Sequence, residues 1–187
     1  MSERKQQILQ AAIEIIVEQG YGALTMRALA RADGIKLGAL QYHFKTREDM
    51  LRGLVAYIAD EYQKVLDAMA SDVDSLDIEG LLEVVGGEPA EGTLQVNKLW
   101  PQLWAMGQVE PLVAELGDDI YDKYLQILEK KIAAAGGESP RAEAICLMSM
   151  VEGSILFLSE GKRWHKDADA VQEILLGFIK AKYGTGA

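Results

Sequence analysis

The sequence contains little that would support a disulfide, a metal site or a membrane span. Cys146 is its only cysteine, which excludes a disulfide within the chain and suits a reducing compartment. His43 has only His165 as a fellow histidine, and no cysteine or carboxylate cluster keeps metal-ligand spacing with it, so we expect no metal and no cofactor. No apolar run reaches the ~20 residues that a membrane helix needs, and the N-terminus lacks a secretory pattern. We therefore expect a soluble cytoplasmic protein that does not bind membranes.

No nucleophile is paired with a base at a recognisable spacing, so we assign no catalytic residue and expect no enzymatic activity. Free cysteines are usually buried, and we expect the same of Cys146 in the apolar stretch AICLMSM. A redox-sensing thiol is the alternative for that residue.

The sequence is rich in apolar residues that favour α-helices. Hydrophobic residues make up 49% of the 187 positions, and leucine, alanine, isoleucine and methionine far outnumber valine and threonine. This composition predicts an all-α protein, with about nine helices and no strand. Residues 2–62 form one expected domain, and residues 63–187 form a larger one.

Acidic residues are concentrated in the second part of the chain. The net charge is −10, but residues 1–52 hold eight basic and six acidic side chains, whereas the remainder holds 11 basic and 23 acidic ones. An acidic total therefore does not exclude contact between the first part and a polyanion.

Apolar spacing and helix-ending residues predict the positions of the helices. Thr46 and Asp49 have the spacing of a capping box, Ser139 can cap a helix whose first residue is Pro140, and Pro101 marks either a kink or a helix start. A loop is expected at 86–92, and a helix resumes after it. The other expected helices cover residues 4–18, 26–32, 37–43, 46 to about 69, 75–85, 111–135, 140–160 and 167–182.

Residues 25–44 have the pattern of a helix-turn-helix. Thr25 is a good N-cap, Gly34 can adopt a positive φ in a sharp turn, and small or apolar anchors flank that turn at Ala30, Ile35 and Leu40. Alone, this pattern also fits an ordinary helical hairpin.

The stretch ILQAAIEIIVEQGYGALTMRALARADGIKLGALQYHFKTREDML resembles the N-terminal domain of the TetR family of transcriptional regulators. The resemblance implies a homodimer that binds a double-stranded DNA operator, a short pseudopalindrome, and usually represses transcription until a small molecule enters the C-terminal domain. Positions that commonly meet phosphates in the family are occupied by Thr25, Tyr42, His43 and Arg47, and the positions facing the groove by Lys36, Leu37, Ala39 and Gln41. The basic residues Arg27 and Lys45 complete the expected DNA contacts.

Two positions depart from the family pattern. Lys36 stands where serine or threonine is usual, so the recognition helix loses a cap and gains a cation. Gln41 stands where tyrosine is frequent, and its amide can pair with adenine. Leu37 cannot hydrogen-bond to a base but can contact a thymine methyl group.

Aromatic residues of the second part form either a core or a ligand pocket. Trp100 and Trp104 share one helix face, and a carboxylate among such rings suits a cationic ligand, whereas Leu, Met and Ile would suit a fatty or aromatic one. The candidate pocket residues are Trp100, Trp104, Tyr121, Tyr124, Glu152 and Phe157.

The last two helices carry long apolar faces that form either intramolecular core or a four-helix dimer interface. The TetR resemblance favours the dimer, for which the candidate residues are Met148, Val151, Ile155, Leu175, Phe178 and Ile179. The sequence thus predicts a ligand-responsive DNA-binding regulator. The alternative is a helical small-molecule-binding protein or enzyme that does not use its DNA-binding domain.

Overall fold

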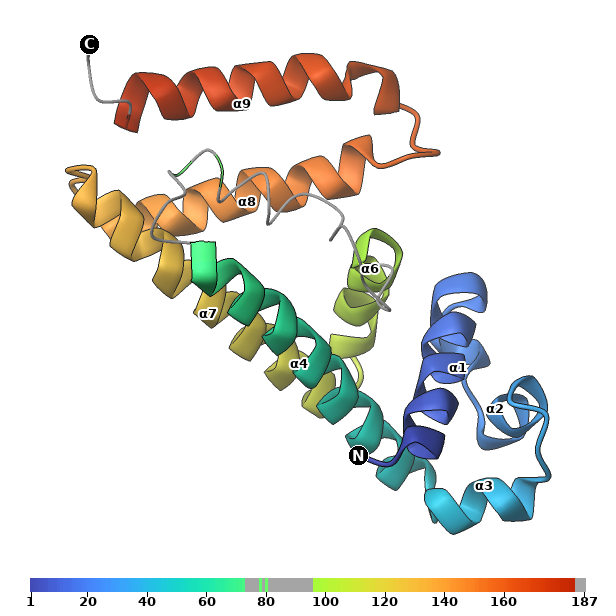
Figure 1. Ribbon diagram of the computed structural model, residues 1–187. Helices are drawn as coiled ribbons and strands as arrows, with labels where there is room; N and C mark the ends of the chain where they lie inside the picture. Colours follow the sequence, from blue (N-terminus) through green and yellow to red (C-terminus); the bar gives the residue numbers. More distant parts are fainter. Residues whose placement is uncertain (73–77, 79, 81–95, 184–187) are drawn as a thin grey trace. The chain divides into compact units, whose positions relative to one another are not determined.

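Figure 1 shows the computed structural model, which describes residues 1–72, 78, 80 and 96–183. Within these residues the chain forms α-helices and short 3₁₀ helices and no strand, which confirms the predicted all-α fold. Two compact units are distinguished by their packing: unit 1 comprises residues 1–66 and 90–119, and unit 2 comprises residues 67–89 and 120–187. The division into functional domains at residues 2–62 and 63–187 stays a prediction.

The helices of unit 1 follow the predicted pattern closely. A short 3₁₀ segment, η1, stands between the first two and was not predicted, and Pro101 lies inside a helix rather than at its start. The helices are α1 (Glu3–Gln19), η1 (Tyr21–Ala23), α2 (Met26–Ala32), α3 (Leu37–His43), α4 (Arg47–Asp72), whose residues from Asp67 onward belong to unit 2, and α6 (Val96–Gly107).

The core of the N-terminal helices is built on α1. Its apolar residues recur at helical spacing, so they share one face, and that face is buried: Ile8, Leu9, Ala12, Ile13, Ile15 and Ile16. Gly20 ends the helix with φ 80°, a conformation that glycine adopts without steric cost. The ion pair between Arg4 and Asp33 joins α1 to the end of α2.

The start of α4 is fixed by the predicted capping box. Asp49 donates its amide to Thr46 Oγ1 at 3.0 Å, and Thr46 donates its amide to Asp49 Oδ2 at 3.2 Å. One turn later, Gly53 leaves room for the buried ring of Phe44, since a Cβ at residue 53 would lie 2.7 Å from Phe44 Cε1. The end of α3 is therefore held against α4 by close packing.

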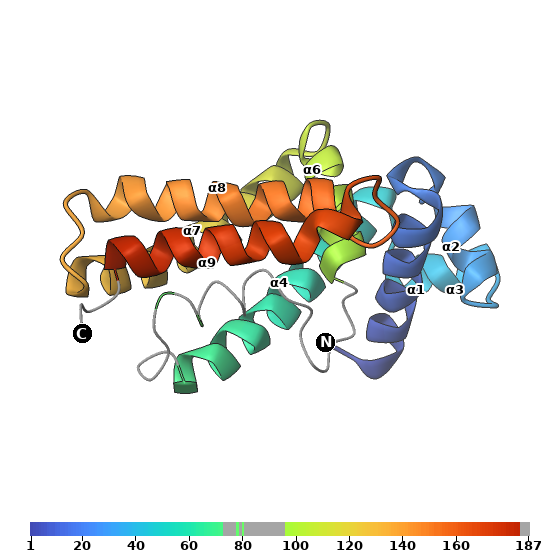
Figure 2. The same cartoon turned by 90° about the horizontal axis from the view of Figure 1, so that it is seen from above.

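Unit 2 contains the last helices of the chain. Helix α7 (Pro111–Ala134) contributes its residues from Ile120 onward, followed by α8 (Pro140–Leu158), η2 (His165–Asp167) and α9 (Ala168–Tyr183). Helices α8 and α9 lie side by side (Figure 2). The predicted loop at 86–92, and all of the predicted helix at 75–85 except residues 78 and 80, lie outside the described residues.

A carboxylate organises the start of α8. Ser139 occupies the N-cap position, as predicted, but its side chain makes no capping bond. Instead Glu143 accepts the Ser139 amide at 3.0 Å and the Tyr183 hydroxyl at 2.6 Å, and Lys182 Nζ lies 3.8 Å from the same carboxylate. The hydrogen bond from Tyr183, followed by that from the Ser139 amide, lowers the pKa of Glu143.

The prediction that Cys146 is buried is wrong. The buried face of α8 is formed by Ala144, Leu147, Met148 and Val151, and Cys146 lies outside this face and is exposed. Among the described helices, none combines the length and apolarity that crossing a bilayer requires.

The Glu143 contacts predict how acid destabilises the protein. A carboxyl group whose pKa is lowered on folding stabilises the native state above its unfolded pKa, and this contribution is lost as the pH falls through the lowered value. We expect Glu143→Gln to lower the melting temperature at pH 7, and the difference from wild type to shrink below about pH 4.5. Thermal unfolding followed by circular dichroism between pH 3 and 7 measures this.

The matched control is Glu160→Gln, which removes the same charge from an exposed position outside the α8–α9 contact. A Glu143→Gln deficit that stays constant from pH 7 to pH 3 would contradict the assigned role of the carboxylate.

Candidate nucleic-acid interface

Helices α2 and α3 form the predicted helix-turn-helix. Thr25 caps α2 by accepting the Ala28 amide at 3.1 Å, and Gly34 turns the chain with φ 70°. The Ile35 amide then donates to the Ala30 carbonyl at 2.9 Å, which closes the turn. Ala30 is 3% and Leu40 0% exposed, so the two helices meet through buried small and apolar side chains. Both helices are therefore held in one geometry by packing.

One face of α3 is turned outward and carries the residues predicted to read DNA. Tyr42 is 86% exposed, Lys36, Ala39 and Gln41 are exposed, and Leu37 is half-buried. No side chain caps α3 at Lys36, as expected from the loss of the usual serine or threonine. An exposed helix of this kind matches the dimensions of a DNA major groove, and its polar and apolar side chains can reach base edges.

The predicted phosphate contacts surround this face. Thr25 and Arg27 are exposed at the start of α2, where the unpaired amides of a helix N-terminus attract anions. Lys45 is exposed after α3, and half-buried His43 lies edge-on to Tyr42, with ring centroids 5.4 Å apart. The structure thus places these candidates on one module of unit 1.

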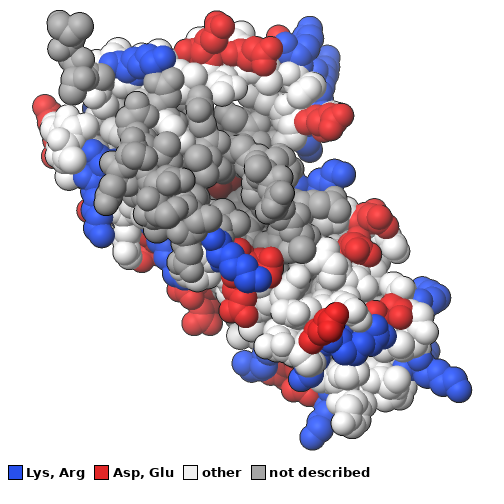
Figure 3. Space-filling view, in the orientation of Figure 1, with Lys and Arg blue, Asp and Glu red and all other residues white. Residues whose placement is uncertain are grey.

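A hollow of about 930 Å³ beside α3 adds cations that the sequence analysis missed. Predicted residues Tyr42, His43 and Lys45 line it, but so do Lys5 of α1 and Arg52 of α4. Lys5 Nζ lies 5.3 Å from the centroid of the Phe44 ring, and Arg52 pairs with Glu48 at 2.8 Å. Lys5 and Arg52 lie near α3 only because α1, α3 and α4 pack together. The sequence motif of the helix-turn-helix therefore did not predict them. Figure 3 shows Lys and Arg side chains interspersed with Asp and Glu on the visible face.

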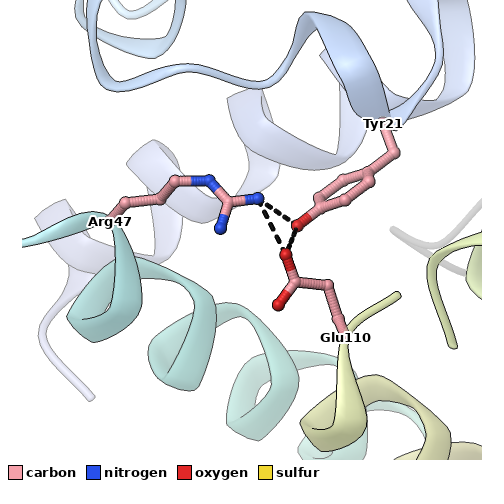
Figure 4. Close-up of polar contacts among 3 residues, drawn as sticks. All are labelled: Tyr21, Arg47 and Glu110. Atoms are coloured by element: carbon pink, nitrogen blue, oxygen red, sulfur yellow. Dashed lines mark hydrogen bonds and ion pairs between the residues drawn. The ribbon is translucent and has the colours of Figure 1, made fainter. Parts of the chain in front are cut away.

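Arg47, a predicted phosphate contact, makes an intramolecular contact in this structure. Its Nη2 lies 2.9 Å from Glu110 Oε1 and also donates to the Tyr21 hydroxyl, which donates to the same Glu110 oxygen (Figure 4). The three side chains come from η1, the start of α4 and the residue before α7, all within unit 1. Tyr21 and Glu110 were missed because 63 residues separate Glu110 from Arg47 and no local pattern links them.

Charge, burial and hydrogen bonding shift the pKa values of Glu110 and Tyr21. The Tyr21 hydroxyl, and after it the Arg47 guanidinium, lower the pKa of Glu110. Burial, followed by the bond to Glu110, raises the pKa of Tyr21. At neutral pH the contact therefore consists of a carboxylate, a guanidinium cation and a neutral phenol.

The ligand candidates are distributed over both units. Trp100 and Trp104 belong to unit 1, where Trp100 is buried against the Tyr62 ring at a centroid distance of 5.2 Å. In unit 2, Glu152 of α8 lies close enough to Tyr124 of α7 to affect its acidity: burial and then the Glu152 carboxylate raise the pKa of Tyr124 to about 12. The remaining candidates of unit 2 are half-buried Tyr121 and exposed Phe157.

The dimer candidates fall into two groups. Met148, Val151 and Ile179 are buried in unit 2, whereas Ile155 and Leu175 are half-buried and Phe178 is 47% exposed. Phe157, Leu175 and Phe178 line an apolar groove of about 440 Å³ between α8 and α9. The exposed apolar surface of this helix pair therefore includes residues beyond the six predicted ones.

Comparison with known proteins places this geometry in a family. Residues 8–54 match the family model of bacterial regulatory proteins of the tetR family. The HTH-type transcriptional repressor KstR2 of Mycolicibacterium smegmatis is 33% identical over 79 residues, which are 40% of this chain and 38% of that protein. The chain thus matches less than half the length of this curated relative.

Solved structures extend the likeness of the fold to the whole chain. A transcriptional regulator from Saccharomonospora viridis in complex with choline superposes with a TM-score of 0.76 at 21% identity, over 96% of this chain and 97% of that one. A TetR-family transcriptional regulator from Rhodococcus sp. gives a TM-score of 0.72 at 21% identity, over 97% and 100% of the two chains. Each of these relatives is named a transcriptional repressor or regulator. The family-model match and the helix-turn-helix geometry identify residues 8–54 as a domain of the tetR family type, and the solved structures show that the chain shares its fold with TetR-family regulators.

Proposed function

We propose that the chain is a ligand-responsive repressor of the cytoplasm that binds a pseudopalindromic DNA operator as a homodimer and is released by a small molecule. The observation that carries the proposal is the outward face of α3, anchored through buried Ala30 and Leu40 and presenting Lys36, Gln41 and Tyr42. Repression is favoured by KstR2, the relative that matches this part of the chain and is named a repressor.

On DNA, the candidate contact residues of the helix-turn-helix divide into two classes. Lys36 and Gln41 can reach base edges, where a lysine favours guanine and a glutamine favours adenine. Thr25, Tyr42 and His43 contact phosphates, which orients the helix without reading sequence. Because residues 1–52 carry a net charge of only +2, one copy neutralises few phosphates and binds weakly by charge alone. Paired half-sites, with recognition helices ~34–36 Å apart, compensate for this weakness.

The helix pair of α8 and α9 supplies the dimer contact in this proposal. Large apolar side chains are exposed along it, and Phe178 and Ile174 line its groove at 47% and 73% exposure. Exposed apolar surface of this extent is typical of an interface. Two copies would place four helices together around a shared apolar layer, with the buried residues Met148, Val151 and Ile179 supporting it from within each copy.

A cationic ligand is the best-supported effector class. Glu152 supplies a carboxylate near the ring of Tyr124, and aromatic rings with a carboxylate bind quaternary ammonium groups through cation–π and charge attraction. The structural neighbour from Saccharomonospora viridis was solved with choline, which is such a cation. We therefore propose that a quaternary ammonium compound binds in unit 2, near Glu152 of α8 and Tyr124 of α7. Tyr121, one turn before Tyr124 on α7, is a further candidate contact.

Specific DNA recognition is tested at Leu37 and Tyr42. We expect Leu37→Ala to relax the preference at one base pair in each half-site, because a thymine methyl loses its apolar contact. Tyr42→Phe should weaken binding to all duplexes alike, because a phosphate loses a hydrogen bond. Gel retardation on genomic fragments, followed by competition with single-base variants of the recovered site, measures both effects.

Uniform loss of affinity in Leu37→Ala would show that the side chain only packs. No retardation of any fragment by the wild type, at any salt concentration, would favour the helical ligand-binding protein that does not use its DNA-binding domain.

Dimerisation is tested on the α9 face. Phe178→Asp places a charge in the apolar groove, and we expect it to shift sedimentation from dimer to monomer at micromolar concentration. Gln172→Asp adds the same charge at an exposed position that does not line the groove and should remain dimeric. A monomeric wild type, or equal behaviour of the two variants, would contradict the proposed interface.

Effector binding is tested with choline. We expect choline to raise the melting temperature, since a ligand present at ~100 times its Kd stabilises the native state by about 2.7 kcal/mol. Glu152→Gln should abolish this shift, whereas Glu173→Gln, an exposed position on α9, should keep it. The uncharged isostere 3,3-dimethylbutanol should have no effect on the wild type. A shift that survives in Glu152→Gln would remove the carboxylate from the site.

A further inference from the structure

We propose that Glu110 competes with DNA phosphates for Arg47, so that the contact among Tyr21, Arg47 and Glu110 limits the DNA affinity of the chain. This inference rests on the proposed DNA-binding function and adds two residues, Tyr21 and Glu110, that control the strength of binding from outside the helix-turn-helix.

The geometry gives the carboxylate and a phosphate the same binding partner. Glu110 Oε1 accepts from Arg47 Nη2 at 2.9 Å and from the Tyr21 hydroxyl, and the hydroxyl accepts from the same Nη2 (Figure 4). The Arg47 side chain is 48% and that of Glu110 21% exposed, so a phosphate can reach the guanidinium at the side where the contact is open to solvent. A guanidinium binds carboxylate and phosphate with the same donors.

The charges make this a competition. Arg47 is one of eight cations in residues 1–52, whose net charge is only +2, so its charge is a large share of what the module offers to DNA. Paired with Glu110, the guanidinium is neutralised, and the adjacent carboxylate repels an approaching phosphate. Each phosphate contact of Arg47 therefore requires that the attraction to Glu110 be overcome.

Glu110 is held at the contact by its main chain. Its amide donates to the Met106 carbonyl of α6 at 2.8 Å, and its carbonyl accepts from the Val113 and Ala114 amides of α7 at 2.9 and 3.2 Å. The position of the turn between α6 and α7 thus sets the position of the carboxylate. Movement of this turn within unit 1 would release or restore the competing charge without any change in α2 or α3.

The test uses the full chain and a duplex selected by the wild type from random-sequence DNA. Glu110→Gln keeps a hydrogen-bond acceptor and removes the charge, whereas Glu110→Ala removes both. Glu115→Gln is the matched control, because it removes the same charge at an exposed position of α7 in unit 1. Fluorescence anisotropy gives the Kd of each variant, and circular dichroism confirms its folding.

We expect both Glu110 variants to bind DNA about two- to five-fold more tightly than Glu115→Gln, a range that corresponds to a partly exposed ion pair. The gain should disappear in an Arg47→Ala background, where Glu110→Gln and Glu115→Gln become equal, since the effect acts through the guanidinium.

Three results would overturn the inference. Weaker binding by Glu110→Ala would show that Glu110 orients Arg47 for DNA, and equality of Glu110→Gln with the control would show that the ion pair does not oppose binding. An undiminished gain in the Arg47→Ala background would place the effect elsewhere. These outcomes differ from failure of the proposed function, in which the wild type selects no duplex at all and no competition exists.

Discussion

The buried face of α1 is the contact on which the DNA-binding module depends. Helices α2 and α3 have seven residues each, too few to be stable alone, because helix nucleation is unfavourable and short helices gain few hydrogen bonds. Their order comes from the apolar layer formed by Ile8, Ile13 and Ile16 together with Leu29 and Leu40, all within 1% of complete burial. The exposed face of α3 is therefore held in place by residues that lie in the core.

The distribution of charge along the chain also differs between its first part and the remainder. Side chains that contact a polyanion have to be cationic or neutral at the contact, whereas the rest of the surface can be acidic and still hold a stable fold. Residues 1–52 carry a small positive excess, and the remaining chain carries 23 acidic against 11 basic residues. A net charge taken over the whole chain thus says nothing about DNA binding, because the opposing contributions come from different parts.

Local signals in the sequence were sufficient for the α-helices of the first part, though not for the 3₁₀ segment η1. Thr25 and the pair of Thr46 and Asp49 cap helices as predicted, and Gly34 takes the positive φ that the turn requires. Contacts between distant residues were not predictable in this way. Glu110 meets Arg47 through the packing of α4 against the turn after α6, and Cys146 is exposed because of the direction in which α8 turns its buried face. Hydrophobic periodicity locates a helix, but it does not determine which neighbour each polar side chain will meet.

Lys36 shows how recognition and folding place opposite demands on one position. A serine, threonine or aspartate at the start of α3 would stabilise a helix by about 1 kcal/mol through a capping bond, and the lysine makes no such bond. The chain has the less stable residue at a point where a cation can approach DNA. A substitution that restored the cap at this position would stabilise α3 and, under the proposed function, would remove a cation that can reach a base edge.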